Sequence, residues 1–173
     1  EWLKEKNKDN QELRENLIES QELIKKSIDN IRQVSRSIHP PLIDEFGFYK
    51  SLEHLFQSFS NYIFDIHDQI EINEAKLTIT QQISLYRIIQ EALINVSRHS
   101  KATYVSIKCI ISRSNIVLTI IDNGIGLKEG FIFSMGLKGI ESRVNNLMGT
   151  FNLMNSKKGG ACLKICMPLE KHK

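Results

Sequence analysis

The chain has 173 residues, of which 41% are hydrophobic and 25% charged, an ordinary globular composition that excludes a wholly disordered chain and a disulfide-dense mini-protein. The 23 basic and 20 acidic residues give a net charge of +3, which provides no strong field for nucleic acid. No apolar run approaches the roughly 20 residues that span a bilayer. We therefore expect a cytoplasmic protein, or the cytoplasmic part of a membrane-anchored one, with no nucleic-acid partner and no membrane contact from this fragment. Because the chain begins with Glu1 rather than Met, we also expect it to be a piece of a longer protein.

The first forty residues predict one long helix. They contain no Gly or Pro before Pro40 and are rich in good helix formers. Leu17, Ile24, Ile31 and Ile38 recur every seven residues, which is typical of a helix in a bundle or coiled coil. Two consecutive prolines then end the helix. The alternative is a helix that packs on its own domain. We expect a first part over residues 1–44 and a second over residues 45–173.

The second part mixes helical and strand patterns. The expected elements are a helix over 45–66, a strand over 65–74, a helix over 80–100, strands over 103–111 and 116–122, a helix over 137–148, and strands over 151–155 and 161–167. Strict alternation of strand and helix is absent. This order predicts an α+β fold, a two-layer α/β sandwich, rather than a doubly wound parallel sheet. Three cysteines without metal-like spacing, Cys109, Cys162 and Cys166, are expected to be buried free thiols in a reducing compartment.

Polar residues recur on the helix predicted over 80–100. Glu91, Asn95 and His99 follow one another in steps of four, so they form one slowly drifting stripe. A carboxylate, an amide and an imidazole in such a row could handle phosphates and a hydrated Mg²⁺ ion, which prefers oxygen ligands. The alternative is an ordinary solvated helix face.

Two glycine-containing motifs follow. Asp122, Gly124 and Gly126 come directly after a strongly apolar strand, where a carboxylate can accept a hydrogen bond from an amine and glycines allow close approach of a ligand. The alternative is a tight turn between strands. A dinucleotide-binding fingerprint fails, because no helix follows at once. Gly136 and Gly139 open the next helix, whose N-terminus suits phosphate, although an ordinary helix start is the alternative.

A fourth motif is Gly159-Gly160 before the last strand, which taken alone would be a hairpin. In this order and spacing, the four motifs resemble the ATP-binding domain of sensor histidine kinases, the Bergerat-type (GHKL) fold shared with gyrase, Hsp90 and MutL. Residues 90–102, 122–127 and 135–144 are similar to the subfamily that pairs with NarL/LuxR-type response regulators, which includes nitrate sensors and the DesK thermosensor. Residues 35–48 resemble the end of that subfamily's second dimerisation helix and its linker. The resemblance covers about residues 20–169.

The resemblance implies transfer of the ATP γ-phosphoryl group to a histidine, a reaction that depends mostly on positioning and charge neutralisation. Asn95 would bind Mg²⁺, and Glu91 would act as a base or polarise the attacking histidine. His99 and Lys101 would lie near the phosphates or the ribose. Asp122 would accept from the adenine amine. The glycines implied in nucleotide binding are Gly124, Gly126, Gly136, Gly139 and Gly160.

The resemblance also implies a homodimer formed through the N-terminal helices, and a response regulator as partner. The sequence departs from the family in two places. No phosphoacceptor histidine of the family's type is present, and His39 stands at a helix end, so the acceptor is expected upstream of Glu1. Ala161 replaces the Thr that usually follows the last glycine pair. The alternatives are a non-catalytic nucleotide-binding or dimerisation module of the same fold, and an anti-sigma-type serine kinase.

Overall fold

In the computed structural model the chain divides into two units, residues 1–40 and 41–173. The structure describes residues 14, 17–18, 20–21, 24, 43–60 and 64–170. The described positions of the first unit are all helical, and Leu17, Ile18 and Ile24 among them expose their side chains. The rest of the predicted heptad pattern, together with His39, lies outside the described residues.

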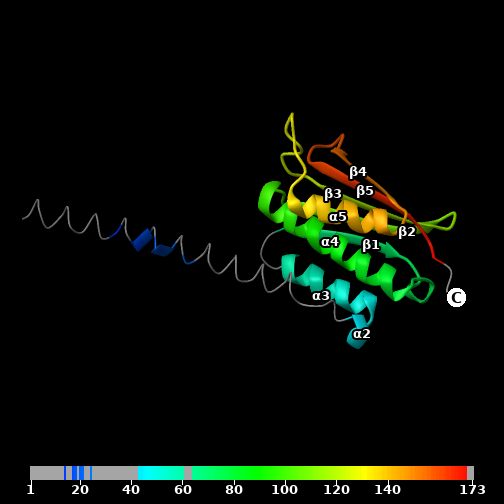
Figure 1. The fold of residues 1–173 in the computed structure, drawn as a ribbon. Coiled ribbons are helices and arrows are strands. Elements are labelled where there is room, and N and C mark those ends of the chain that lie inside the picture. Colours follow the sequence, from blue (N-terminus) through cyan, green and yellow to red (C-terminus); the bar gives the residue numbers. More distant parts are fainter. Residues whose placement is uncertain are drawn as a thin grey trace, which may run out of the picture. The chain divides into compact units, whose positions relative to one another are not determined.

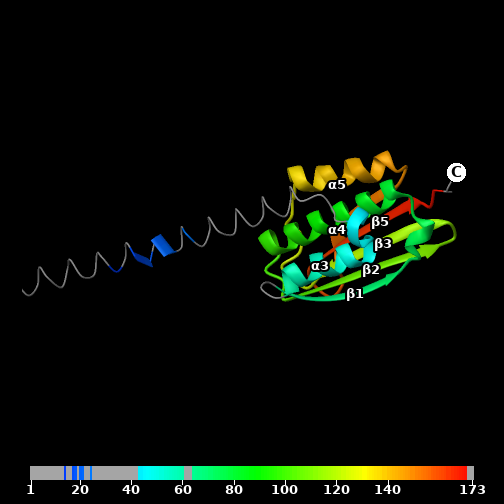
Figure 2. The same cartoon turned by 90° about the horizontal axis from the view of Figure 1, so that it is seen from below.

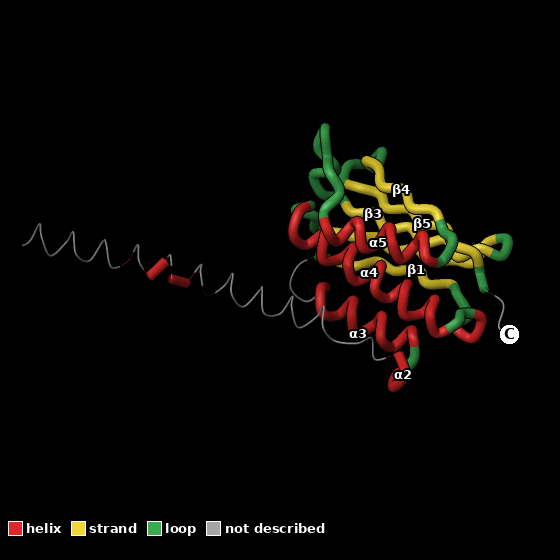
Figure 3. Tube along the Cα trace, in the orientation of Figure 1, coloured by secondary structure: helices red, strands yellow, loops and turns green. Residues whose placement is uncertain are grey.

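A five-stranded sheet forms one layer of the second unit (Figures 1 and 3). Its strands are β1 (Asp65–Glu71), β2 (Tyr104–Ser112), β3 (Asn115–Asp122), β4 (Thr150–Asn155) and β5 (Ala161–Pro168). Their order in the sheet is β1-β2-β3-β5-β4, with β1 parallel to β2 and all other neighbours antiparallel. The strand that ends at Asp122 is therefore the central one.

Helices form the second layer and cover one face of the sheet (Figure 2). They are α2 (Ile43–Phe46), α3 (Phe48–Ser60), α4 (Ile79–His99) and α5 (Met135–Asn146), with a short 3-10 helix, η1 (Glu74–Lys76), between β1 and α4. The predicted α+β two-layer sandwich is confirmed. No helix in the part of the chain that the structure describes is both long and apolar enough to cross a membrane.

The core lies between the two layers, and the alternation of β3 explains where Asp122 ends up. Ile116, Leu118 and Ile120 point to the helices and are buried, so Asp122, two residues further on, points the same way. Leu85 and Leu93 of α4 are fully buried against this face. Burial of each such side chain contributes roughly 1.5–3 kcal/mol. The same hydrophobic pattern that forms the core therefore carries one carboxylate to its edge.

The helix expected over 45–66 is interrupted and shorter. Gly47 adopts φ +80°, a left-handed conformation that no helix tolerates, and it separates α2 from α3. The carboxylate of Glu74 then caps α3, because its Oε2 accepts hydrogen bonds from the amides of Phe48 at 3.2 Å and Tyr49 at 3.4 Å. Since Glu74 lies 26 residues beyond Phe48, local sequence did not reveal this cap.

The position of α4 on the sheet is fixed at its N-terminus. Thr78 and Gln81 form a capping box, in which each side chain accepts from the other residue's amide. The Gln81 side-chain amide also donates to the carbonyl of Pro168 at 2.8 Å, and the Thr78 hydroxyl bonds Glu170 at 3.0 Å. These bonds connect the start of α4 to the end of β5, so the polar stripe on α4 has a defined place over the sheet.

Candidate functional site

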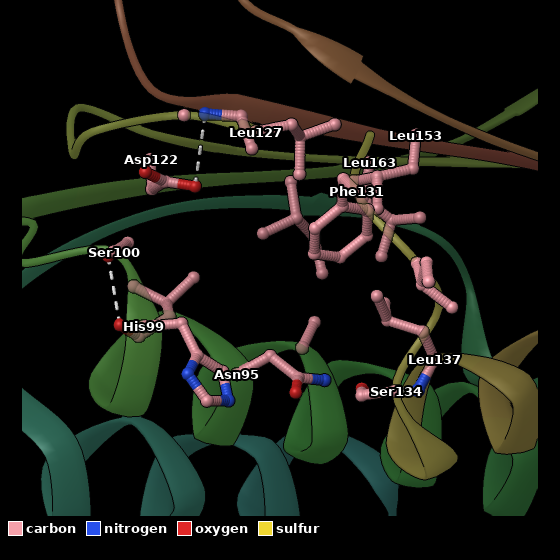
Figure 4. Close-up of a pocket in the computed structure, with 16 residues that line it drawn as sticks. Asn95, His99, Ser100, Asp122, Leu127, Phe131, Ser134, Leu137, Leu153 and Leu163 are labelled. Atoms are coloured by element: carbon pink, nitrogen blue, oxygen red, sulfur yellow. Dashed lines mark hydrogen bonds between the residues drawn. The ribbon is translucent and has the colours of Figure 1, made fainter. Parts of the chain in front are cut away.

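A cavity of about 330 Å³ lies between α4, the end of β3, the loop over residues 123–134 and the start of α5 (Figure 4). Most of its lining is aliphatic or aromatic, supplied by residues such as Ile120, Leu127 and Phe131. The polar side chains in the lining are those of Asn95, His99, Ser100, Asp122 and Ser134. An apolar cavity with a few convergent polar groups is the usual form of a small-molecule site.

Asp122 is held rigidly at one end of the cavity. Its side chain is buried, with 6% of its surface exposed. Oδ1 accepts from the amide of Gly124 at 2.8 Å, and Oδ2 accepts from the amide of Ala161 at 3.2 Å. Because each carboxylate oxygen has two lone pairs, both can still accept from a ligand. Backbone donors thus orient the carboxylate and leave it able to bind an amine in the cavity.

Two glycines are required around Asp122 by close approach of the backbone. A Cβ on Gly124 would overlap the carbonyl oxygen of Ser100, which accepts from the Ile125 amide at 2.8 Å. Gly160 adopts φ +76°, and its Cβ would overlap the main-chain carbonyl of Asp122. The motifs Asp122–Gly126 and Gly159-Gly160, 33 residues or more apart in the sequence, therefore meet at one carboxylate.

Ala161 contributes through its backbone. The bond to Asp122 comes from the Ala161 amide, and the residue's place in β5 is set by pairing with Asn155 and by the neighbouring pair Ile121–Cys162. A Thr side chain at this position is therefore not needed to orient the carboxylate.

The other end of the cavity is built from side chains of α4. The Asn95 side-chain amide donates to the Glu91 carbonyl at 2.9 Å and lies 3.4 Å from Glu91 Oε1. This fixes the orientation of the Asn95 amide group, whose oxygen receives no hydrogen bond from the described residues. Figure 4 shows Asn95 and His99 projecting from α4 toward the cavity. Glu91 lies one helical turn before Asn95 on α4 and is half-buried.

The start of α5 closes this end. The helix begins at Met135, two residues before the expected start, because the Ser134 hydroxyl caps it by accepting from the Leu137 amide at 3.4 Å. Gly136, in the first turn, lies against α4, and its Cβ would overlap Glu91 Oε1 and come within 3.5 Å of Asn95 Nδ2. Gly139 lies past the first turn, where the Arg143 guanidinium donates to its carbonyl at 2.8 Å.

The cavity therefore brings together four sequence-predicted residues directly in its lining, Asn95, His99, Asp122 and Gly126, with Gly124, Gly136 and Gly160 packed behind them. Lys101 is exposed, adopts φ +53° and follows the lining residue Ser100 without lining the cavity itself. The apolar part of the cavity lining was not predicted from the sequence. Leu153 and Leu163 follow ordinary strand alternation, so no motif distinguishes them from core residues.

The residues present suit a metal that takes few protein ligands. Among the described residues no group of three or more His, Cys, Asp or Glu side chains could hold a metal ion. The oriented Asn95 amide offers one neutral oxygen at the cavity. Mg²⁺ commonly takes one or two protein oxygens, with waters and substrate phosphates as its other ligands. This donor set fits Mg²⁺ that arrives with a nucleotide.

Comparison with known proteins agrees with this geometry. A family model described as histidine kinase-, DNA gyrase B-, and HSP90-like ATPase matches residues 80–171. The sensor histidine kinase ComP of Bacillus subtilis is 32% identical over 164 residues, which cover 92% of this chain and 21% of ComP. The oxygen sensor histidine kinase NreB of Staphylococcus carnosus is 24% identical, over 93% of this chain and 48% of NreB. The chain thus spans about a fifth and about half of these relatives.

The fold is also that of solved histidine kinases. The blue-light activated histidine kinase of Erythrobacter litoralis superimposes with a TM-score of 0.61 over 69% of this chain and 41% of that chain, at 16% identity. The fold and the cavity define an ATP-binding domain. The chain belongs to the histidine kinase-, DNA gyrase B- and HSP90-like ATPase family, and its second unit is an ATP-binding domain similar to those of sensor histidine kinases.

Proposed function

We propose that this chain transfers the γ-phosphoryl group of Mg-ATP to a histidine that lies upstream of Glu1, for relay to an aspartate of a NarL/LuxR-type response regulator. Residues 1–44 act as the second helix of the dimerisation hairpin with its linker, and the working protein is a cytoplasmic or cytoplasm-facing homodimer. The observation that supports the proposal most is the oriented, buried Asp122 carboxylate at one end of an apolar cavity whose other end carries Asn95.

The base of the nucleotide binds at the Asp122 end. The exocyclic amine of adenine donates to a carboxylate oxygen that Gly124 or Ala161 already orients. Ile120 and Leu127 line the cavity beside it and bury the faces of the ring. A guanine base presents a carbonyl oxygen where adenine has its amine, so it would place an acceptor against a buried carboxylate. This arrangement selects adenine over guanine.

The phosphates extend toward α4 and α5. The first amides of α5, around Gly136, have no intrahelical hydrogen-bond partner. They form the positive end of the helix dipole, which favours phosphate oxygens. Asn95 would hold Mg²⁺ through its side-chain oxygen. When bound, Mg²⁺ neutralises charge on the phosphates of the nucleotide. The absence of a Cβ at Gly136 allows α5 to approach Glu91 and Asn95 this closely.

Glu91 serves the incoming histidine. A neutral imidazole nitrogen attacks the γ-phosphorus, the bond from that phosphorus to the β–γ bridging oxygen breaks, and ADP leaves with the electron pair. Glu91 accepts or polarises the proton on the far imidazole nitrogen, which raises the nucleophilicity of the attacking nitrogen. The Glu91 carboxylate lies within reach of the Asn95 amide, at 3.4 Å, so the base and the metal ligand are adjacent.

Phosphoryl transfer in trans tests the proposal. This chain is mixed with labelled ATP, Mg²⁺ and a separate fragment that carries the upstream helix of the full-length protein. We expect label on the upstream histidine, loss of transfer in Asn95→Ala and Glu91→Gln, and normal transfer in Asn145→Ala, which alters an exposed residue of α5. Label on His39 of this chain, or no transfer from the wild-type chain, would contradict the proposal.

A further inference from the structure

Asn155, the last residue of β4, binds the loop that borders the cavity. Its side-chain Oδ1 accepts from the Leu127 amide at 2.6 Å, and its Nδ2 donates to the Leu127 carbonyl at 3.1 Å. The two residues are 28 positions apart. A single side chain thus satisfies both main-chain groups of Leu127, as a neighbouring strand would.

The conformation of Gly126 depends on this contact. Gly126 adopts φ +71°, and a Cβ there would come within 2.6 Å of Asn155 Oδ1 and 3.2 Å of the Gly160 carbonyl. The Asn155 amide therefore occupies the space that any other residue at position 126 would need. Both Gly126 and Leu127 line the cavity, so Asn155 shapes its wall without entering it.

Asn155 also connects this wall to Asp122. In the pairing of β4 with β5, Asn155 lies opposite Ala161, whose amide donates to Asp122 Oδ2 at 3.2 Å. The residue is thus attached on one side to the strand that orients the carboxylate, and on the other to the loop that covers the adenine end. The two bonds from Asn155 therefore oppose displacement of Leu127 away from β4 and the carboxylate beside it.

The remainder of the loop has a different restraint. The rings of Phe133 and Phe151 meet edge to face with centroids 5.5 Å apart, which holds the far end of the loop to β4. Between the two attachments, Gly130 adopts φ +73° with no atom within 4 Å of its Cβ position, and Ile132 is 83% exposed. The loop is therefore attached to β4 at Leu127 and at Phe133, and between these two attachments Gly130 and Ile132 are open to solvent.

We propose that Asn155 is a positioning residue for adenine binding. By holding the backbone of Gly126 and Leu127 against β4, it keeps the apolar wall at the distance from Asp122 that one purine ring requires. This inference rests on the adenine-binding role of the cavity. It predicts a defect in nucleotide affinity, because the transferring phosphoryl group lies at the opposite end, beside Asn95.

The test compares Asn155→Ala with Asn152→Ala, an exposed asparagine of the same strand that lies opposite Lys164. Loss of two hydrogen bonds should weaken ADP binding about tenfold in Asn155→Ala. Asn155→Asp keeps the acceptor for the Leu127 amide but places a carboxylate oxygen against the Leu127 carbonyl, so its affinity should be intermediate. Asn152→Ala should bind ADP as the wild type does.

The kinetics separate positioning from a purely structural role. In the phosphoryl transfer assay, KM for ATP should rise about tenfold in Asn155→Ala, in line with two lost hydrogen bonds, while kcat stays near the wild-type value. Two results for Asn155→Ala would overturn the inference. One is an ADP affinity within twofold of the wild-type value; the other is a lower kcat together with a less stable apo-protein, while KM for ATP stays unchanged. Failure of the wild-type chain to bind ADP would instead overturn the adenine-binding role itself.

Discussion

The two ends of the cavity are built in different ways. At the end proposed to bind adenine, here the adenine end, the Asp122 carboxylate is held by amides from two separate segments, and the surrounding backbone is so close that Gly124 and Gly160 have no room for a Cβ. At the end proposed to bind the phosphates, here the phosphate end, Glu91 and Asn95 belong to one helix, and the first turn of α5 lies against them. The adenine end is built from the ends of sheet strands β3 and β5, whereas the phosphate end depends on how α5 packs against α4.

This difference has an energetic consequence. A hydrogen bond to a charged group contributes about 1.5–3 kcal/mol, and removal of one partner in a buried setting costs more than it would at the surface. Substitutions at the adenine end should therefore affect folding and binding together. Substitutions at the phosphate end should affect binding of the Mg-nucleotide while folding is largely preserved.

The largest effect is expected at Gly160. In Gly160→Ala the new Cβ combines a left-handed φ with overlap of the Asp122 carbonyl, and we expect a loss of about 3–4 kcal/mol in the free energy of unfolding. Gly159→Ala is a matched control, because φ is +93° but no atom lies within 4 Å, so only about 1–2 kcal/mol should be lost. Urea denaturation measures both values. Equal losses would contradict the close approach at Gly160.

The next effect concerns the carboxylate itself. Asp122→Asn keeps the shape but turns an NH₂ group toward the amide of Gly124 or Ala161, so one buried donor loses its acceptor. ADP affinity should fall by about 2–3 kcal/mol, roughly 30- to 150-fold. Calorimetric titration of ADP measures the loss, with Asp68→Asn, an exposed carboxylate on β1, as control. A change below fivefold would show that Asp122 does not contact the ligand.

A smaller effect distinguishes two glycines of α5. Alanine is the better helix former by about 1 kcal/mol, so both Gly136→Ala and Gly139→Ala should favour the helix. Gly136→Ala also overlaps Glu91 Oε1, whereas Gly139→Ala meets only the far end of the long Arg143 side chain, at 3.0 Å. We expect about tenfold weaker Mg-ADP binding in Gly136→Ala alone, from a displacement that costs about one hydrogen bond. Equal binding by the two variants would contradict the contact between α5 and α4.

The smallest effect near neutral pH lies away from both ends. Burial raises the pKa of the Cys109 thiol to about 12. Because the folded-state pKa is the higher one, stability is unaffected below the ordinary thiol pKa, near 9, and falls as pH rises from there to about 12. The pKa of the Cys162 thiol is also raised by burial, and the positive charge of Lys164 offsets part of that rise. A thiol reagent at pH 8 should leave Cys109 unmodified until urea unfolds the protein. Rapid native labelling of Cys109 would contradict its burial.

Much of the site could be predicted because its signals are local. Asp122 was expected at the end of a strongly apolar strand, and steps of four placed Glu91, Asn95 and His99 on one stripe. Ser134 is a helix-capping residue, so the start of α5 at Met135 was within reach of the sequence.

The rest required tertiary structure. The Asn155 contact joins residues 28 positions apart, and the Glu74 cap of α3 joins residues 26 apart. No local sequence pattern around Asn155 or Glu74 predicts these contacts. The break at Gly47 was also missed, because the apolar stripe that predicted the helix over 45–66 begins at Phe48, and it is the backbone angle of Gly47 that separates α2 from α3.

One cavity is proposed to bind adenine at Asp122 and the Mg²⁺-bound phosphates at Asn95. Amide chemical shifts of isotope-labelled protein test it most directly, with ADP added first without and then with Mg²⁺. We predict that ADP alone shifts Gly124, Gly126, Leu127 and Ala161, and that Mg²⁺ adds shifts confined to Glu91, Asn95 and Gly136. No shifts at millimolar ADP, or Mg²⁺-dependent shifts at the Asp122 end, would contradict the account.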